Sequence, residues 1–343
     1  MVFQRILFIQ TAFIGDAILT LPALQKLKLT YPEFLIDVLC IPKSREIFEA
    51  SPVVENVIVL DKKGRQKSLF QTLKFAKELK KNNYLKLYSS HRSFRTSLIV
   101  LMLGVKESYG FDNSSFKYTY RNLIKYDKSA HEVQRNLNLI GFNPENENWK
   151  IKPEIIFSND VKAKVRAYIN DKKIKKDFIA IAPGSVWETK RYPEKYFIGI
   201  IKDLNKKKYQ VVLIGSEKDR ELCSAITGKD SSLTINTAGD LSVIESIHLL
   251  QHAKLLISND SAPTHMGMAA DIKVLTIYCS TIHDFGFYPY NNKSEVISYD
   301  DLECKPCGIH GRNKCPIKTF DCGEKLVPQK VITKMEEMLN ANQ

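Results

Sequence analysis

The sequence predicts an α/β protein with two doubly wound, parallel-sheet domains. Apolar runs of strand length alternate with segments of helical periodicity, and this alternation occurs twice along the chain. It is typical of parallel sheets that are covered by helices on both faces. With 343 residues, 44% of them hydrophobic, the chain is long enough to bury two cores of ordinary size.

The predicted elements fall into two sets. Strands of the first set are predicted over 5–10, 35–40, 57–60 and 84–88, with helices over 16–29 and 68–81. Strands of the second set are predicted over 178–182, 210–214, 233–236, 255–257 and 274–278, with helices over 194–204, 218–226 and 243–252. A charge-rich stretch over 143–177 separates the sets, and we place the linker near 148–153. We therefore expect an N-terminal domain over 1–150, a C-terminal domain over 151–343 and a ligand site in a cleft between them. We allow for the C-terminal helix to pack back on the first domain.

The charge balance indicates an anionic partner. The formal net charge is +13, which suits nucleic acid, a phospholipid surface or phosphorylated substrates. The N-terminal segment MVFQRILFIQTAFIGD lacks the end of a cleavable signal, and no stretch approaches the roughly 20 apolar residues of a membrane span. We expect a cytoplasmic protein that can touch a membrane surface.

The most informative stretch is Ser258–Met266, where a predicted core strand gives way to a helix. Ligands of open α/β sheets bind at the carboxyl ends of the strands. Asp260 and Ser261 can cap the following helix, whose first N–H groups would then face the phosphate of a nucleotide. Capping alone is the alternative interpretation.

A carboxylate occupies the corresponding place in the first domain. The loop after the first strand has no GxGxxG pattern, so the fingerprint of a dinucleotide site is absent there. Gly15 permits a tight turn, and Asp16 follows it at the start of a helix. The helix dipole favours the ionised carboxylate, so Asp16 is expected to have a low pKa and to be available as a base at neutral pH. A routine helix cap explains this aspartate equally well.

Two further loops of the second domain carry candidate ligand groups. After the strand over 178–182, Ser185 offers a hydroxyl, and Lys190 with Arg191 forms a plausible diphosphate clamp. A solvated basic loop is the alternative, although Trp187 in the same loop speaks against it. Glu217 follows the strand over 210–214 and can accept hydrogen bonds from a ribose or base, or it can simply start a helix.

Four motifs in this order resemble the heptosyltransferases of glycosyltransferase family 9. They are RILFIQTAFIGDAILTLPAL, IAPGSVWETKRYP, VVLIGSEKD and SNDSAPTHMGMAA, and they extend over most of the chain. The resemblance implies a GT-B fold, in which two Rossmann-like domains face each other across a cleft. The C-terminal domain would bind an ADP-heptose donor, and the N-terminal domain would bind the lipid A core acceptor in lipopolysaccharide biosynthesis.

The resemblance also implies roles for single residues. Asp16 matches the general base, Lys190 the phosphate-binding lysine, Glu217 the acidic residue near the nucleoside and Asp260 the aspartate of the donor loop. Four more positions fall within matching motifs as donor-binding candidates: Ser185, Ser261, Thr264 and His265. The chain departs from the family pattern at Ala262, Thr264 and Tyr192, where the family commonly has Gly, Met and Trp. None of these changes removes a charged group.

The implied reaction is an inverting displacement that needs one base. No Asp-x-Asp motif is placed to carry Mg²⁺ to the diphosphate, so neither a metal nor a cofactor is predicted. An anionic, phosphorylated acceptor at the membrane face would suit the basic residues of the first domain. These candidates are Lys62, Lys63, Arg65 and Lys67 around one turn, and Arg92 with Arg95 after a strand. A solvated basic face without a specific partner is the alternative.

Four cysteines lie in the nineteen residues Cys304–Cys322, which we call the cysteine segment. Cys304, Cys307, Cys315 and Cys322 have a spacing that allows a zinc site, but free or redox-active thiols are favoured. Similar segments occur in the heptosyltransferase II branch, which makes heptosyl-Kdo-lipid A the expected acceptor. Transfer to Kdo-lipid A, as in the heptosyltransferase I branch, and another nucleotide sugar on a glycolipid remain open. A non-enzymatic nucleic-acid-binding protein is disfavoured because no binding module is recognisable.

Overall fold

The computed structural model describes residues 4–143, 145–228 and 233–341. The chain divides into two compact units, Met1–Ile156 and Phe157–Gln343, and each is described here by itself. The sequence placed this boundary at 150/151.

The first unit is built on a six-stranded parallel sheet. Its strands are β1 (Arg5–Gln10), β2 (Leu35–Cys40), β3 (Asn56–Val59), β4 (Lys86–Ser89), β5 (Glu107–Phe111) and β6 (Asn122–Ile124). The order across the sheet is β3-β2-β1-β4-β5-β6. The chain therefore starts in the middle, builds one side of the sheet, and then crosses to the other side after β3. The point where the order reverses lies between β1 and β4.

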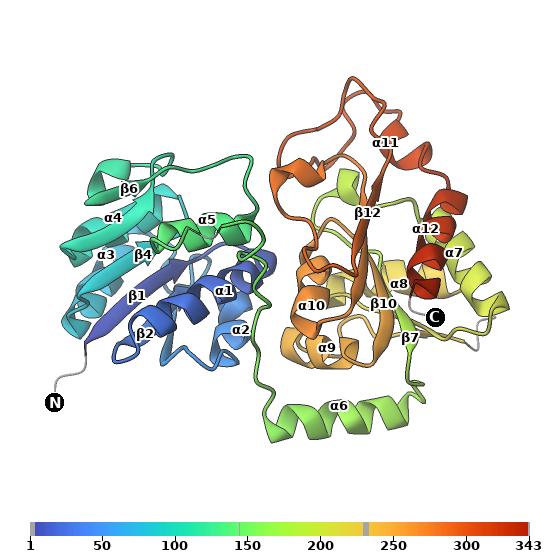
Figure 1. The fold of residues 1–343 in the computed structure, drawn as a ribbon, viewed down its shortest axis with the longest axis horizontal. Coiled ribbons are helices and arrows are strands. Elements are labelled where there is room, and N and C mark those ends of the chain that lie inside the picture. Colours follow the sequence, from blue (N-terminus) through green and yellow to red (C-terminus); the bar gives the residue numbers. More distant parts are fainter. Residues whose placement is uncertain (1–3, 144, 229–232, 342–343) are drawn as a thin grey trace. The chain divides into compact units, whose positions relative to one another are not determined.

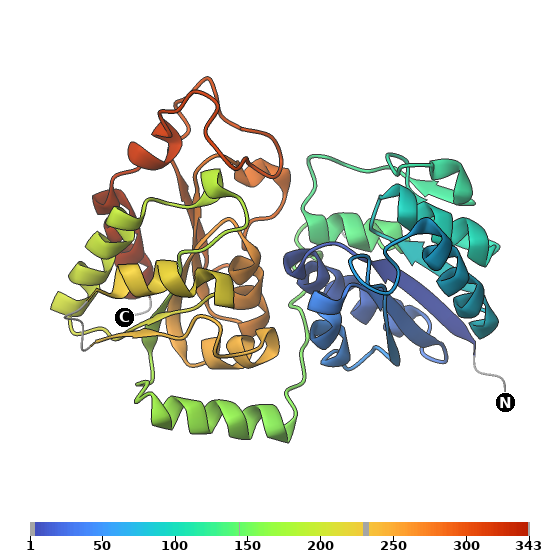
Figure 2. The same ribbon diagram turned by 180° about the vertical axis from the view of Figure 1, so that it is seen from behind.

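Helices cover both faces of this sheet. The helices are α1 (Ile14–Thr30), α2 (Arg45–Glu49), α3 (Leu69–Leu79), α4 (Phe94–Leu103) and α5 (Glu132–Leu139). Figure 1 shows α1, α2 and α5 on one face, and Figure 2 shows the opposite face, where α3 and α4 lie side by side. This is the two-sided packing that the near-continuous apolar strands predict.

Local sequence sets the start of the helix that was predicted over 68–81. Ser68 Oγ accepts a hydrogen bond from Gln71 N at 3.1 Å, and Gln71 Oε1 accepts one from Ser68 N at 3.0 Å. This reciprocal capping box satisfies two backbone donors that the first turn leaves free. The apolar face of α3 then contributes buried side chains, including Leu79, to the core between the sheet and α4.

The second unit repeats the architecture. Its strands are β7 (Phe178–Ala182), β8 (Val211–Leu213), β9 (Thr234–Asn236), β10 (Ala253–Asn259), β11 (Lys273–Tyr278) and β12 (Glu295–Ser298). The strands are all parallel, in the order β12-β11-β10-β7-β8-β9. Read from β9 to β12, this is the same topology as that of the first sheet read from β3 to β6. The corresponding reversal lies between β7 and β10.

The helices of the second unit also form two layers. They are α6 (Asn159–Asp171), α7 (Glu194–Lys206), α8 (Arg220–Thr227), α9 (Val243–Leu250), α10 (Ala262–Ala270), α11 (Asp321–Glu324) and α12 (Pro328–Asn340). Helices α9 and α10 lie on one face of the sheet in Figure 1, and α7 and α8 lie on the other face in Figure 2. Helix α6 falls inside the stretch that the sequence treated as a connection, and it packs against α9.

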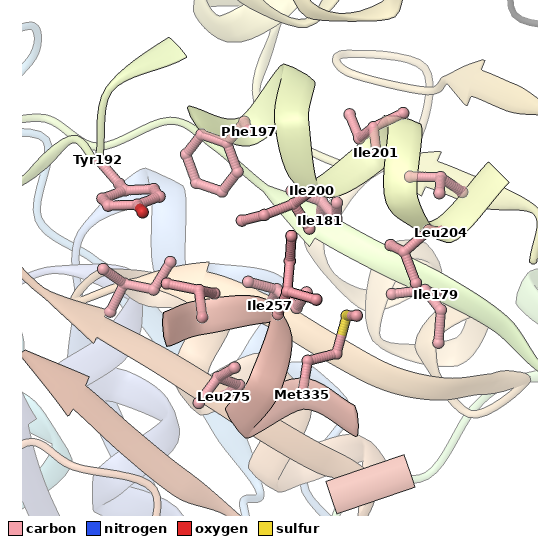
Figure 3. Close-up of a cluster of buried hydrophobic side chains, with 14 of the residues drawn as sticks. Ile179, Ile181, Tyr192, Phe197, Ile200, Ile201, Leu204, Ile257, Leu275 and Met335 are labelled. Atoms are coloured by element: carbon pink, nitrogen blue, oxygen red, sulfur yellow. The ribbon is translucent and has the colours of Figure 1, made fainter. Parts of the chain in front are cut away.

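The core of the second unit joins α7 and α12 to the sheet. Figure 3 shows Phe197, Ile200 and Leu204 of α7 above the strand residues Ile179 and Ile257. Met335 of α12 is buried in the same cluster. The terminal helix, which the sequence left free to pack back on the first domain, thus buries its apolar face in its own unit. Among the described residues, none of the helices has both the length and the apolar character that crossing a bilayer requires.

Candidate functional site

Each sheet has one topological switch point, and several of the predicted site residues lie at these two places. In doubly wound sheets, ligands bind at the carboxyl ends of the strands where the strand order reverses. In the second unit these ends carry the loop over 183–193 after β7 and the start of α10 after β10. In the first unit they carry the start of α1 after β1 and residues 90–93 after β4.

A buried ion pair lies at the switch point of the second unit. Lys190 Nζ lies 2.6 Å from Asp260 Oδ2, and the two side chains are 12% and 10% exposed. Both residues were predicted from the sequence, seventy positions apart, and the fold brings them together. Because a carboxylate repels a diphosphate, Asp260 is best placed to hold the lysine cation at this edge rather than to bind the phosphates itself.

Two further groups surround this pair. Thr281 Oγ1, which sequence reasoning missed, donates to Asp260 Oδ2 at 2.7 Å. His265 is buried, and its Nδ1 has no hydrogen-bond partner among the residues that the structure describes. The pKa of His265 is lowered to about 4, mainly by burial; the Asp260 charge opposes this shift and the Lys190 charge adds to it. The imidazole is therefore neutral at physiological pH, and its unpartnered nitrogen can accept or donate one hydrogen bond.

Asn259 fixes the loop over 183–193 to the end of β10. This fully buried side chain donates from Nδ2 to Pro183 O at 2.7 Å and accepts from Tyr192 N at Oδ1, at 3.0 Å. The two bonds hold both ends of the loop that carries Lys190. Sequence reasoning did not single out Asn259, although it lies inside the motif that supplied Asp260.

Several predicted donor-binding groups are engaged within the protein. Arg191 donates to Ser185 O at 2.8 Å and pairs with Glu188 at 2.9 Å, so its guanidinium braces its own loop. Glu217 is exposed and pairs with Arg220 at 2.7 Å, and this pair lowers the pKa of the Glu217 carboxyl.

The polar residues at the start of α10 also have partners. Ser261 and Thr264 both donate from their hydroxyls to Asn259 O, at 3.3 and 3.2 Å. Pro263 has no N–H, and Thr264 N donates to Ser261 O at 3.1 Å. The start of this helix therefore has fewer backbone donors for a phosphate than the sequence suggested.

At the switch point of the first unit, Asp16 lies in the first turn of α1. It is half-buried, and its Oδ2 accepts a hydrogen bond from Phe13 N at 3.2 Å. The pKa of Asp16 is raised from 3.8 to about 7, first by burial and second by the negative charge of Glu132. The expectation of a low pKa was therefore wrong, because burial outweighs the backbone hydrogen bond and the helix terminus. A carboxyl that titrates near pH 7 is well matched to a general base.

Glu132 is the acidic partner that sequence reasoning missed. It lies in the first turn of α5, is buried, and pairs with Arg135 at 3.0 Å. Arg92 lies over the ring of Tyr126, with its guanidinium carbon 4.1 Å from the ring centroid, and its charge opposes the upward pKa shifts of Asp16 and Glu132. The first switch point thus has two acids and two arginines in electrostatic contact.

The predicted acceptor-binding cations divide into two groups. Lys62 donates from Nζ to Thr11 O and to Thr11 Oγ1, both at 2.9 Å, and burial together with the Arg95 charge lowers its pKa to about 8. Arg95 donates to the carbonyl oxygens of residues 66 and 67. Lys62 and Arg92 therefore lie beside the end of β1, whereas Lys63, Arg65 and Lys67 are exposed on the turn.

The four cysteines of the cysteine segment line one cavity of about 210 Å³. All are free thiols, with Cys304 exposed and Cys322 buried. Burial raises the pKa of Cys307, and the neighbouring thiols Cys304 and Cys315 add to the shift. Within the described ranges, no three His, Cys, Asp or Glu side chains are arranged to hold a metal ion.

Two Rossmann-like units, each built on a six-stranded parallel sheet with one reversal of strand order, have the fold of the GT-B class. Comparison with known proteins then identifies the family. The chain belongs to glycosyltransferase family 9 (heptosyltransferase), whose model matches residues 72–316, more than half of the chain. Lys190, Glu217 and Asp260 lie within the matched residues, and Asp16 precedes them.

Individual relatives agree with this assignment over nearly the whole chain. Lipooligosaccharide heptosyltransferase 2 of Campylobacter jejuni is 25% identical over 95% of this chain and 96% of its own length. The glycosyltransferase family 9 structure from Veillonella parvula superposes with a TM-score of 0.86 at 20% identity, covering 99% of this chain and 98% of that one. ADP-heptose LPS heptosyltransferase II of E. coli superposes with a TM-score of 0.80 at 22% identity, covering 98% of each chain.

Proposed function

We propose that the protein transfers L-glycero-D-manno-heptose from ADP-heptose to the inner core of lipopolysaccharide, with heptosyl-Kdo-lipid A as the acceptor. The observation that carries this proposal is the carboxyl of Asp16, whose pKa of about 7 suits a base at the switch point of the first unit. The names of the relatives supply the donor and the acceptor class.

The reaction is a single displacement with inversion. Asp16 takes the proton from the acceptor hydroxyl, whose oxygen forms a bond to the anomeric carbon of the heptose. The bond from that carbon to the diphosphate oxygen breaks, and ADP leaves with the electron pair. The negative charge that develops on the diphosphate is stabilised by Lys190, which Asp260 and Thr281 orient.

Other donor contacts follow from the same site. The neutral His265 offers its unpartnered Nδ1 to a donor oxygen. Ser185 lies in the loop after β7, and Ser261 and Thr264 lie at the start of α10. Arg191 and Glu217 follow β7 and β8, and each is held in an ion pair. Since Arg191 is already engaged by Glu188, Lys190 carries most of the diphosphate charge.

The acceptor would be bound by cations of the first unit. Lys62 and Arg92 lie beside the end of β1 and suit phosphate or carboxylate groups close to the reacting hydroxyl. Lys63, Arg65 and Arg95 extend this basic surface and suit anionic groups of the core or of the inner membrane. The protein would then act at the cytoplasmic face of that membrane, and nothing in this function requires nucleic acid or a metal cofactor.

The decisive experiment incubates purified protein with ADP-heptose and defined truncated lipid A cores and identifies products by mass spectrometry. We expect one heptose to be added to heptosyl-Kdo-lipid A, and none to be added by Asp16→Asn. Lys190→Ala should lower both the rate and the affinity for ADP, whereas Asp16→Asn should bind ADP normally.

Each alternative gives a different product. Addition of heptose to Kdo-lipid A alone would replace the proposed acceptor, and activity only with another nucleotide sugar would replace the donor. Full activity of Asp16→Asn would refute the assignment of the base. Binding to nucleic acid that falls steeply with salt, without transfer to any core, would favour the non-enzymatic interpretation.

A further inference from the structure

The tip of the cysteine segment lies against the loop that carries Lys190. Thr189 N donates to Arg312 O at 3.0 Å, and Arg312 N donates back to Thr189 Oγ1 at 2.8 Å. Thr189 is buried, with 3% of its surface exposed. These reciprocal bonds join two loops that are more than a hundred residues apart in the sequence, directly beside the lysine.

The same contact includes Ser280, two residues after the end of β11. Ser280 Oγ donates to Thr189 Oγ1 at 2.9 Å, and Cys307 N donates to Ser280 O at 2.8 Å. The next residue, Thr281, donates to Asp260, which is the partner of Lys190. The cysteine segment is therefore bonded to both sides of the buried ion pair, through Thr189 on one side and Ser280 on the other.

The base of the segment is also fixed. The side chain of Lys305 is 2% exposed, pairs with Asp300 at 2.9 Å, and donates to the carbonyl oxygens of Tyr278 and Tyr299, both at 3.2 Å. At the tip, the rings of Trp187 and His310 stack with their centroids 6.3 Å apart. The segment is thus held at its base by β11 and at its tip by the loop over 183–193.

The backbone of Gly311 in the cysteine segment lies close to the side chain of Lys190. Its φ is +75°, and a Cβ atom there would lie 3.0 Å from Lys190 Cγ, 3.0 Å from Ser280 Oγ and 3.1 Å from Thr189 Oγ1. Any side chain at this position would therefore press on the stem of the lysine and on the two hydroxyls that fix its loop. Gly308, three residues earlier, also has a left-handed φ of +82°, but a Cβ there would have no atom within 4 Å.

We propose that Gly311 and Arg312 are positioning residues for Lys190, so that the cysteine segment sets the affinity of the protein for the donor diphosphate. The backbone of these two residues fixes Thr189, and Thr189 fixes the neighbouring lysine against Asp260. This inference rests on the proposed role of Lys190 in binding the diphosphate. It gives the cysteine segment a function that does not depend on a metal.

The two glycines provide a matched pair of variants. Gly311→Ala and Gly308→Ala introduce the same methyl group at the same kind of backbone conformation, and both carry its conformational cost. Only Gly311→Ala meets Lys190, Thr189 and Ser280. We expect Gly311→Ala to weaken ADP binding about tenfold in calorimetry, corresponding to the loss of one or two hydrogen bonds at the loop. Gly308→Ala should bind ADP within about twofold of the unmodified protein.

A second pair tests the same contact by its chemistry. Thr189→Val keeps the shape but removes the acceptor for Arg312 N and Ser280 Oγ, whereas Thr189→Ser keeps the hydroxyl. We expect the serine variant to recover most of the ADP affinity that the valine variant loses. In steady-state kinetics, the KM for ADP-heptose should rise in Gly311→Ala and Thr189→Val while the KM for the acceptor stays unchanged, a split that general loss of folding would not produce.

Lys190→Ala separates this inference from the function on which it rests. If Lys190→Ala binds ADP as the unmodified protein does, the diphosphate role of the lysine is refuted. If Lys190→Ala loses affinity but Gly311→Ala and Gly308→Ala behave alike, the positioning role is overturned. If Gly311→Ala does not fold, the comparison of Thr189→Val with Thr189→Ser decides, and equal affinities of that pair would overturn the proposal.

Discussion

Neutralising Asp16 should make the protein more stable as well as inactive. The unfolded chain has Asp16 with a pKa near 3.8, whereas the folded protein raises that pKa to about 7. Between these values the folded state binds more protons than the unfolded state, so stability falls as the pH rises through this window. Above pH 7 the full cost of ionising Asp16 in the folded protein is present.

The magnitude follows from the shift. A difference of about 3 pKa units corresponds to about 4 kcal/mol at pH 8, and to less than about 1 kcal/mol at pH 4, where the aspartate is mostly protonated in the folded state. Asp16→Asn removes this titration and retains an oxygen that can accept the bond from Phe13 N. We therefore expect Asp16→Asn to raise the free energy of unfolding by up to about 4 kcal/mol at pH 8, with little change at pH 4.

The assay is urea denaturation followed by tryptophan fluorescence. The two tryptophans lie in different units, and Trp149 is buried in the first unit, where its ring stacks on His131 with centroids 4.8 Å apart. In a Trp187→Phe background, Trp149 reports the unfolding of the unit that contains Asp16. Glu33→Gln, which neutralises an exposed carboxyl of the same unit, is the control for a change in net charge.

Equal effects of Asp16→Asn at pH 4 and pH 8 would refute the reasoning, because the stabilisation would then not come from the titration of this carboxyl. Equal effects of Glu33→Gln and Asp16→Asn at pH 8 would refute it as well. In that case net charge, rather than the buried position of Asp16, would be responsible.

Three other predictions concern activity, the buried ion pair and the thiols. The turnover rate should rise with pH through about 7 as Asp16 ionises. Glu132→Gln should move the midpoint of this pH profile to lower pH, because the Glu132 charge is the second cause of the raised pKa of Asp16. An unchanged midpoint would contradict this prediction. Asp260→Ala should lower the free energy of unfolding by about 3–5 kcal/mol, because Lys190 would be left buried without its partner, and it should weaken ADP binding in calorimetry. Unchanged stability and ADP affinity would argue against the importance of this ion pair. Alkylation at pH 8, followed by mass spectrometry, should modify the exposed Cys304 first. Cys223 should stay unmodified, because burial raises the pKa of its thiol to about 12. Modification in the reverse order would contradict the structure.

The central strands were predicted accurately because their signal is local. The strands over 5–10, 35–40 and 178–182 have the bounds that the sequence predicted, since each is a continuous apolar run between polar loops. The edge strands β6 and β12 were missed: they are short and only partly buried, so they lack such a run. Helix α6 was missed because its residues are mostly polar and only Val165 is buried.

Site residues were predictable where a motif carried them and unpredictable where only the fold brings groups together. Lys190 and Asp260 were found from separate loops, but their ion pair depends on the adjacency of β7 and β10. The shift in the pKa of Asp16 was predicted with the wrong sign because its causes, first burial and second the charge of Glu132 on α5, arise only when the chain folds and α5 packs against α1. Contact of Arg191 with the diphosphate stays a prediction. Its ion pair with Glu188 was not predicted, because the pair forms only when the loop folds into a tight turn.

The ion pair of Lys190 and Asp260 also bears on which anions the protein admits. The carboxylate of Asp260 already neutralises the charge of Lys190 within the protein, so an anion that approaches the lysine competes with Asp260 for the same cation. A ligand with one phosphate exchanges one anionic contact for another and gains little. A diphosphate has a second phosphate for the surrounding donors while the first shares the lysine with Asp260. If Lys190 binds the donor diphosphate as proposed, the buried pair would therefore favour nucleoside diphosphates over the free phosphate of a cell.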